Sequence, residues 1–220
     1  MYRWLAPARI AFAALIAVAL GFAGHRAATG ITGLPDFFSY FGNLSALAAM
    51  VVLLLGGLAG RAGRDAVPGT VRGAVLLCTT VTGLAYGLLQ APYPVDMMVP
   101  WVHHVVHQAV PAVVLADWLI DPPERRISRV EAAGWLVFPL LYLAYTLLRG
   151  LVVDWYPYRF LDPTIPGGYC RVAGASFLTT GAFALAGAVL LWAGNTLADR
   201  RDAAAGSTPP GRGAHAAPSS

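Results

Sequence analysis

Three histidines, His103, His104 and His107, lie in one uncharged stretch, Met97 to Ala116, that is long enough to cross a bilayer. On a helix, His107 can align with His103 one turn before it or with His104 three residues before it. Three uses of these side chains stay open: hydrogen bonds between helices, catalysis or ligand binding, and chelation of a metal. No HExxH glutamate follows them and neither cysteine lies at their depth, so the sequence predicts no metal and no cofactor.

Arg149 lies at the outer end of another apolar stretch, Ala132 to Leu148. An ionisable group within hydrocarbon costs about 3 kcal/mol or more, so such groups are kept for function or for pairing. The guanidinium could extend to the lipid headgroups, or it could hold a lipid carboxylate or phosphate through two hydrogen bonds. Both interpretations stay open, and Asp154 or Asp162 could pair with Arg149 within the chain.

The composition indicates an integral protein of the cell membrane. Of the 220 residues, 57% are hydrophobic and 12% are charged, against roughly 25% charged residues in soluble domains. Six uncharged stretches approach the roughly 20 residues of a membrane span, which predicts an all-α bundle of six transmembrane helices. These stretches are 10–24, 37–60, 73–95, 97–116, 132–148 and 172–198. The first could instead be the apolar core of a signal peptide, although GHRAATG after it offers a poor cleavage pattern.

The arginines predict the orientation of the bundle. All 15 basic side chains are arginines. Eleven of them lie in the N-terminal segment, in the loops between the second and third and between the fourth and fifth predicted helices, and in the C-terminal tail. Arg9 is expected to extend to the interface and Arg72 to lie in a loop. Because basic residues are concentrated on the cytoplasmic side, both termini are expected in the cytoplasm. No basic cluster alternates with exposed aromatic residues, so no nucleic-acid partner is expected.

The domain organisation follows from the change in composition near the C-terminus. Residues 1–198 are expected to form the transmembrane domain. Residues 199–220 are expected to form a disordered cytoplasmic tail, because they are rich in Ala, Gly, Ser, Pro and Arg and lack large apolar side chains.

Depth along the predicted helices brings several polar residues to one level. The second helix enters from outside, which places Ser39, Asn43 and Ser45 in its outer half. At 1.5 Å per residue, the histidines of the fourth helix lie about 9 to 15 Å deep. Arg149 lies near the outer end of the fifth helix. We therefore expect Asn43, His107 and Arg149 to face one cavity that opens toward the outer leaflet.

Three segments together resemble the six-span androgen-induced-protein-like membrane proteins. They are FSYFGNLSAL at 38–47, HHVVHQAVPAVVLADWLIDPP at 103–123 and YTLLRGLVVDWYPYRFLDP at 145–163. Animal members of that family are intramembrane lipid hydrolases of the threonine type, acting on fatty-acid esters of hydroxy fatty acids with a Thr and a His. The resemblance covers most of residues 10–195 and implies that His107 stands at the catalytic histidine. The family threonine aligns best with Gly42, which carries no nucleophile.

A hydrolase with glycine at position 42 would need another nucleophile. Ser39 and Ser45 lie three residues on either side of Gly42 and share roughly its helical face. Either hydroxyl could be activated by a neutral His107 imidazole, with Arg149 steering a carboxylate head.

The second hypothesis is a non-catalytic membrane protein, and the missing threonine favours it. Such a protein would bind a membrane lipid in the same cavity, with weak or no hydrolysis, or would transport a small solute. The binding residues would then be Asn43, His103, His104 and Arg149. The chain has no credible internal repeat, which weakens the case for an inverted-repeat transporter.

Overall fold

The computed structural model describes residues 4–63, 67–89 and 99–206, and these residues form helices and connections without strands. The elements, in chain order, are α1 (Leu5–Thr29), α2 (Gly33–Phe37), α3 (Phe41–Arg61), α4 (Gly69–Leu89), α5 (Pro100–His104), η2 (Val105–Ala109), α6 (Val110–Ile120), α7 (Arg129–Ala133), η3 (Gly134–Leu136), α8 (Val137–Val153), η4 (Arg159–Leu161) and α9 (Gly168–Gly206). Elements α5, η2 and α6 follow one another without a break and form one long helix, as do α7, η3 and α8.

Within the described residues, four helices are long and apolar enough to cross a membrane. They are Leu5–Thr29, Phe41–Arg61, Arg129–Val153 and Gly168–Ala203. The prediction of an all-α chain with helices suited to a membrane is therefore confirmed. The two other long segments, α4 and the helix 100–120, are not among these four; α4 contains Arg72, and the helix 100–120 contains three histidines and Asp117. The ends that the sequence predicts for the third and fourth spans, Val95 and Met97, lie outside the described residues.

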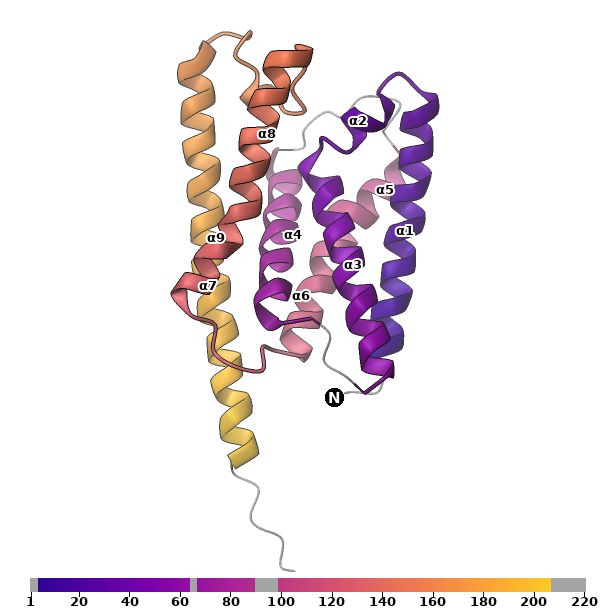
Figure 1. Cartoon of the computed structure of the whole chain (residues 1–220), viewed down its shortest axis with the longest axis vertical. Helices are drawn as coiled ribbons and strands as arrows, with labels where there is room; N and C mark the ends of the chain where they lie inside the picture. Colours follow the sequence, from indigo (N-terminus) through magenta and orange to yellow (C-terminus); the bar gives the residue numbers. More distant parts are fainter. Residues whose placement is uncertain (1–3, 64–66, 90–98, 207–220) are drawn as a thin grey trace, which may run out of the picture.

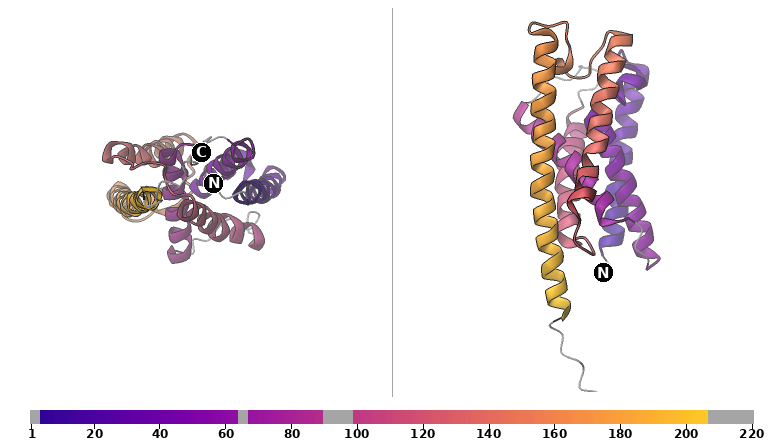
Figure 2. Two further views of the ribbon diagram at one scale, coloured as in Figure 1. Left: turned by 90° about the horizontal axis from the view of Figure 1, so that it is seen from below. Right: turned by 60° about the vertical axis from the view of Figure 1, so that its left-hand side comes forward.

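The long helices are arranged in two flanking pairs with a central pair between them. Helix α1 packs along α3 on one side, α8 and α9 lie next to each other on the opposite side, and α4 and α6 lie between them (Figure 1). Of the most apolar 18-residue stretch of each helix, 39% is buried in α1 and in α3. The buried share is only 11% in Arg129–Val153 and 17% in α9. The α8–α9 pair is therefore the loosely covered side of the bundle, and α9 runs along its whole height (Figure 2).

Helix α9 continues beyond the boundary between positions 198 and 199 that composition predicts for the tail, and it ends at Gly206. Asp199 pairs with Arg126 at 3.1 Å, and Arg201 donates to a backbone carbonyl between α6 and α7 at 3.1 Å. These contacts with the connection before α7 explain why the helix extends further than its composition suggests. Residues 207–220 of the predicted tail lie outside the described residues.

Candidate functional site

His107 lies in a turn of π-helix, η2, in the middle of the helix 100–120. Pro111, four residues later, has no amide hydrogen and cannot donate to the His107 carbonyl, so a regular α-helical turn is not completed here. The carbonyl of His107 faces Gly83 of α4, where an added Cβ would lie 3.1 Å from the oxygen. Single π-helical turns occur frequently at functional sites, which makes this part of the bundle a candidate.

The rings of His103, His107 and Tyr86 lie nearly parallel and each contacts the other two, with the centroids of Tyr86 and His103 5.9 Å apart; we call this group the ring column. The ring of His107 lies 4.4 Å from that of Tyr86, with the planes 8° apart, and 5.5 Å from that of His103. The His107 side chain is buried within this column. His104 is exposed, and its Nδ1 lies 3.1 Å from Oε1 of Gln108. Two of the three histidines thus face the interior of the bundle, and the third faces outward.

Gly42, at the start of α3, lies directly against His107. A Cβ added at position 42 would lie 2.8 Å from Cε1 of His107 and 3.2 Å from Cγ2 of Thr82. Glycine permits this close approach because it has no side chain. The two positions that the resemblance pairs as nucleophile and base are therefore in contact, and the imidazole occupies the space of a side chain at position 42.

The two candidate serines differ in what their hydroxyl groups contact. The Ser39 hydroxyl lies 2.8 Å from the carbonyl of Pro35, to which it donates, and 3.0 Å from the phenol oxygen of Tyr145. Ser45 lies one turn after Gly42, is buried, and its Oγ has no hydrogen-bond partner within the described residues. The Ser39 hydroxyl is thus engaged with α2 and α8, whereas that of Ser45 is not engaged.

Arg149 forms an ion pair with Asp36 of α2, with Nη2 and Oδ1 2.5 Å apart. The prediction that Asp154 or Asp162 is its partner is wrong. Helix α2 lies at one end of the bundle (Figure 1), and the ion pair joins its Asp36 to Arg149 of α8. Asp154 caps α8 in a left-handed conformation with φ of 53°, and Asp162 accepts hydrogen bonds within its own loop.

Further hydrogen bonds hold the α2–α3 connection against α8. The phenol of Tyr142 donates to the carbonyl of Ser39 at 2.7 Å, and the Asn43 amide donates to the carbonyl of Phe37 at 2.8 Å. The predicted site residues are therefore distributed over two groups. Asn43, Ser39 and Arg149 belong to a polar layer around α2, and the interior histidines belong to the ring column.

A cavity of about 490 Å³ lies between α3, α4, α8, α9 and the η4 loop. Most of its walls are apolar, and none of its described lining residues is charged. The lining residues with a hydroxyl group are Thr82, Tyr86, Tyr142, Tyr158, Ser176, Thr179 and Thr180. The cavity adjoins the ring column through Tyr86 and position 42 through Thr82. It was not predicted, although Ser176, Thr179 and Thr180 have the i, i+3, i+4 spacing of one helix face.

The cavity opens on the side where α8 and α9 are least covered. Leu140 of α8 and Leu178 of α9 line it and are 46% and 72% exposed. At the end of the cavity next to the η4 loop, Arg171 donates to the carbonyls of Arg159 and Asp162 at 3.0 and 2.5 Å and so holds this loop in place. The hydroxyl and the amide of Thr164 both donate hydrogen bonds to the Asp162 carboxylate. These bonds, the hydroxyl's more than the amide's, lower the pKa of Asp162 below its usual value.

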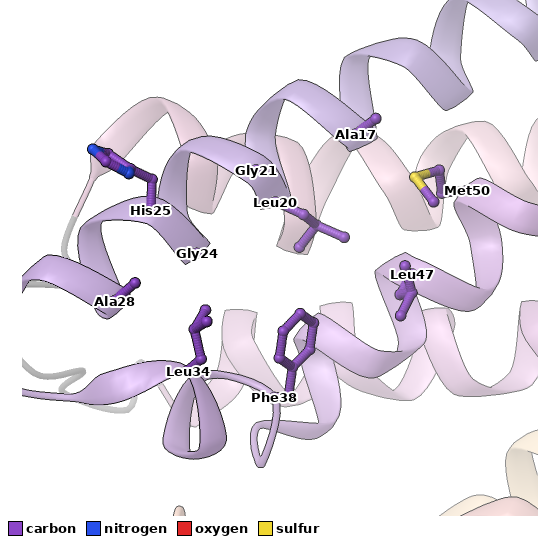
Figure 3. A pocket seen from close by; sticks show the side chains of 10 residues that line it. All are labelled: Ala17, Leu20, Gly21, Gly24, His25, Ala28, Leu34, Phe38, Leu47 and Met50. Carbon is purple, nitrogen blue, oxygen red and sulfur yellow. The ribbon is translucent and has the colours of Figure 1, made fainter.

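A second hollow of about 550 Å³ lies between α1, α2 and α3 (Figure 3). Small residues of α1, among them Ala17, Gly21 and Gly24, form one wall, and Leu34 and Phe38 form the wall opposite (Figure 3). This hollow is a shallow groove on the surface of the bundle, and it has no contact with the ring column among its described lining residues.

Arg9, Arg72, Asp117 and Asp121 meet at the opposite end of the bundle from α2, and the more exposed Arg201 of α9 lies 3.8 Å from Asp121 at their edge. Arg9 of α1 binds Asp117 through Nε at 2.6 Å and Asp121 through Nη2 at 2.8 Å. Arg72 of α4 binds Asp117 at 2.9 Å and the carbonyl of Asp121 at 2.7 Å. Arg9, Arg72 and Asp117 are buried. We call Arg9, Arg72, Asp117 and Asp121 the charge cluster.

The expectation that Arg72 lies in a loop is wrong, because Arg72 lies in α4. The Arg9 guanidinium, expected from the sequence to extend to the interface, is buried against Asp117. Asp117 and Asp121 are four residues apart on one face of the helix 100–120, so both carboxylates point at the same neighbours. They draw both guanidinium groups into the bundle. The sequence indicated this pairing, because Asp117 and Asp121 lie near the same predicted end of the helices as Arg9 and Arg72.

Comparisons of the chain with protein-family models, with curated proteins and with solved structures found no match. The fold defines the class as an all-helical protein with helices suited to a membrane. Its function is therefore argued from the geometry of the cavity, the ring column and the polar layer.

Proposed function

We propose that the protein is a multi-pass protein of the cell membrane that binds a membrane lipid in the cavity between α3, α4, α8 and α9. Six spans and two cytoplasmic termini are part of this proposal. Helix α4 has 21 residues, about 31 Å at 1.5 Å per residue, which matches the thickness of the hydrocarbon core. The beginning of α1 and the end of α9 lie at the same end of the bundle, as an even number of spans requires (Figure 1).

The observation that carries the proposal is the apolar cavity itself. Its volume of about 490 Å³ falls within the roughly 300 to 1,000 Å³ of small-molecule sites. Its walls are mostly apolar with a small number of hydroxyl groups, which is the lining expected of a site for an amphiphile. The opening beside Leu140 and Leu178 would let a hydrocarbon chain enter from the bilayer between α8 and α9.

The geometry favours binding over hydrolysis. Position 42 carries no hydroxyl, the Ser39 hydroxyl is engaged with Pro35 and Tyr145, and His107 is held in the ring column. One observation supports hydrolysis as a second candidate. The unengaged hydroxyl of Ser45 lies one turn from the position that touches His107, and a modest movement could bring the two together.

Retention of lipid by a cavity-filling variant tests the proposal. Ala175 lines the cavity, and Ala173 lies on the exposed surface of the same helix. Purified wild type, Ala175→Trp and Ala173→Trp would be compared by mass spectrometry of the lipid that each retains in detergent. We expect Ala175→Trp to lose the retained lipid and Ala173→Trp to keep it.

Equal retention by both tryptophan variants would contradict lipid binding in this cavity. Hydrolysis is tested in parallel with a panel of lipid esters. Ester turnover that is present in wild type and lost in both Ser45→Ala and His107→Ala would establish the hydrolase instead.

A further inference from the structure

We infer that the ligand of the cavity is an uncharged single-chain amphiphile whose head carries hydroxyl groups, such as a long-chain alcohol or a monoacylglycerol. This inference rests on the proposed function and adds the chemistry of the ligand. It follows from the hydroxyl groups in the wall, from the placement of the nearby charges and from the volume.

Helix α9 presents three hydroxyl groups to the cavity, those of Ser176, Thr179 and Thr180. The Ser176 hydroxyl is buried and has no hydrogen-bond partner within the described part of the chain. Other helical hydroxyl groups here donate to the carbonyl four residues earlier, as Thr82 and Thr196 do, both at 2.8 Å. A buried hydroxyl without a partner costs free energy, and a hydroxyl or carbonyl oxygen of a ligand head would remove that cost.

None of the described residues that line the cavity is charged. The two nearest arginines use Nη2 for their hydrogen bonds, and Nη1 of Arg149 and Nε of Arg171 have no partner among the described residues. Arg149, on the same helix as Tyr142, pairs with Asp36. Arg171, one turn before Ala175 on α9, donates to two carbonyls of the η4 loop. An ionised carboxylate or phosphate among the described lining residues would therefore have no cation beside it, which is costly in hydrocarbon. An uncharged head has no such requirement.

The volume selects for one chain. A cavity of about 490 Å³ lies in the lower half of the range for small-molecule sites, roughly 300 to 1,000 Å³. One chain with a small head suits this volume better than the two chains of a phospholipid. The part of a long chain that exceeds the length of the walls would extend through the opening beside Leu140 and Leu178. The walls along α8 and α9 are lined from Leu136 to Leu143 and from Ala175 to Phe183, about 10 to 12 Å at 1.5 Å per residue.

Competition between ligands that share one chain length tests the inference. Displacement of a fluorescent long-chain alcohol from the purified protein would be measured with hexadecanol, monopalmitoylglycerol, palmitate and hexadecane at pH 9, where palmitate is ionised. We expect hexadecanol and monopalmitoylglycerol to compete at least tenfold better than palmitate, and better than hexadecane.

Variants of the hydroxyl wall identify the contact. Ser176→Ala combined with Thr180→Val should weaken hexadecanol by roughly 2- to 12-fold, the range for one lost hydrogen bond, and leave hexadecane unchanged. Thr196→Val is the matched control, because its hydroxyl donates to Trp192 away from the described lining of the cavity. It should behave as wild type.

Two results would overturn the inference while leaving lipid binding intact. Palmitate could compete as well as hexadecanol and lose this ability in Arg171→Gln, which would assign an anionic head to Arg171. Hexadecanol could also bind the Ser176→Ala, Thr180→Val variant as tightly as wild type. Failure of every chain to compete, together with an unaltered Ala175→Trp, would instead refute the proposed function.

Discussion

Neutralising Asp117 should destabilise the bundle more than any surface change. This carboxylate accepts hydrogen bonds from Arg9 at 2.6 and 3.1 Å and from Arg72 at 2.9 Å. Asp117→Asn would keep the shape of the side chain but leave two buried guanidinium groups with the single carboxylate of Asp121. Removing one partner from a buried ion pair costs about 3 to 5 kcal/mol. At about 2 to 4 °C per kcal/mol for a chain of this size, the melting temperature should fall by roughly 6 to 20 °C.

The chain carries a built-in reporter for this measurement. Cys78 of α4 is buried and Cys170 is exposed. In a Cys170→Ser background, the reaction of a thiol-specific dye with Cys78 on heating reports the opening of the bundle. Asp199→Asn is the matched control, because the ion pair of Asp199 with Arg126 is largely exposed and is worth about 0 to 1 kcal/mol.

A melting temperature for Asp117→Asn within 2 °C of the control would refute the reasoning. A double variant adds a second test of the same idea. Arg72→Met with Asp117→Leu removes one charge of each sign and leaves the pair of Arg9 with Asp121, 2.8 Å apart. Because replacing a buried ion pair by apolar residues is often nearly neutral, this variant should melt above Asp117→Asn. The two substitutions should therefore not be additive.

Three further predictions concern other parts of the molecule. Gly42→Thr should cost about 1 to 3 kcal/mol, measured by the same thermal assay, because its Cβ would lie 2.8 Å from the facing imidazole, and it should create no ester turnover. Arg149→Gln should cost about 1 to 3 kcal/mol by leaving the carboxylate of Asp36 without its ionic partner, and cleavage of the α2 connection by an added protease should accelerate. Reporter fusions after Arg126 should be cytoplasmic and fusions after Pro163 external; a cytoplasmic signal at the second position would contradict six spans.

The positions of the helices could be predicted from the sequence because uncharged apolar stretches and helices coincide. The stretch 10–24 lies within α1, and the stretch 172–198 lies within α9. The ends were less predictable. Helix α1 begins at Leu5, before Arg9, since Asp117 compensates the arginine inside the bundle. Counting arginines on each side of the membrane does not show that Arg9 is paired inside the bundle. Matching arginines and aspartates by their depth along the predicted helices would have shown this pair.

The candidate site was predicted in its composition but not in its grouping. The resemblance pointed to His107 and position 42, which the structure brings into contact. Periodicity and depth placed Arg149 and Asn43 at the same level as His107, but the short helix α2 gathers them into a separate layer. No local pattern in the sequence fixes where five residues between two long helices lie at the end of a bundle.

The charge cluster also sets an order of events during synthesis. Arg9 is separated from Asp117 by 108 residues of chain, so its partner leaves the ribosome long after it. At roughly 5 to 20 residues per second, about 5 to 20 s pass before that carboxylate exists. Throughout this interval α1 must carry an uncompensated guanidinium, which a newly inserted helix can tolerate only by holding it at the headgroups. For a chain that spans the membrane as proposed, we therefore expect the first helix to enter the bilayer at one depth and to shift when the helix 100–120 arrives.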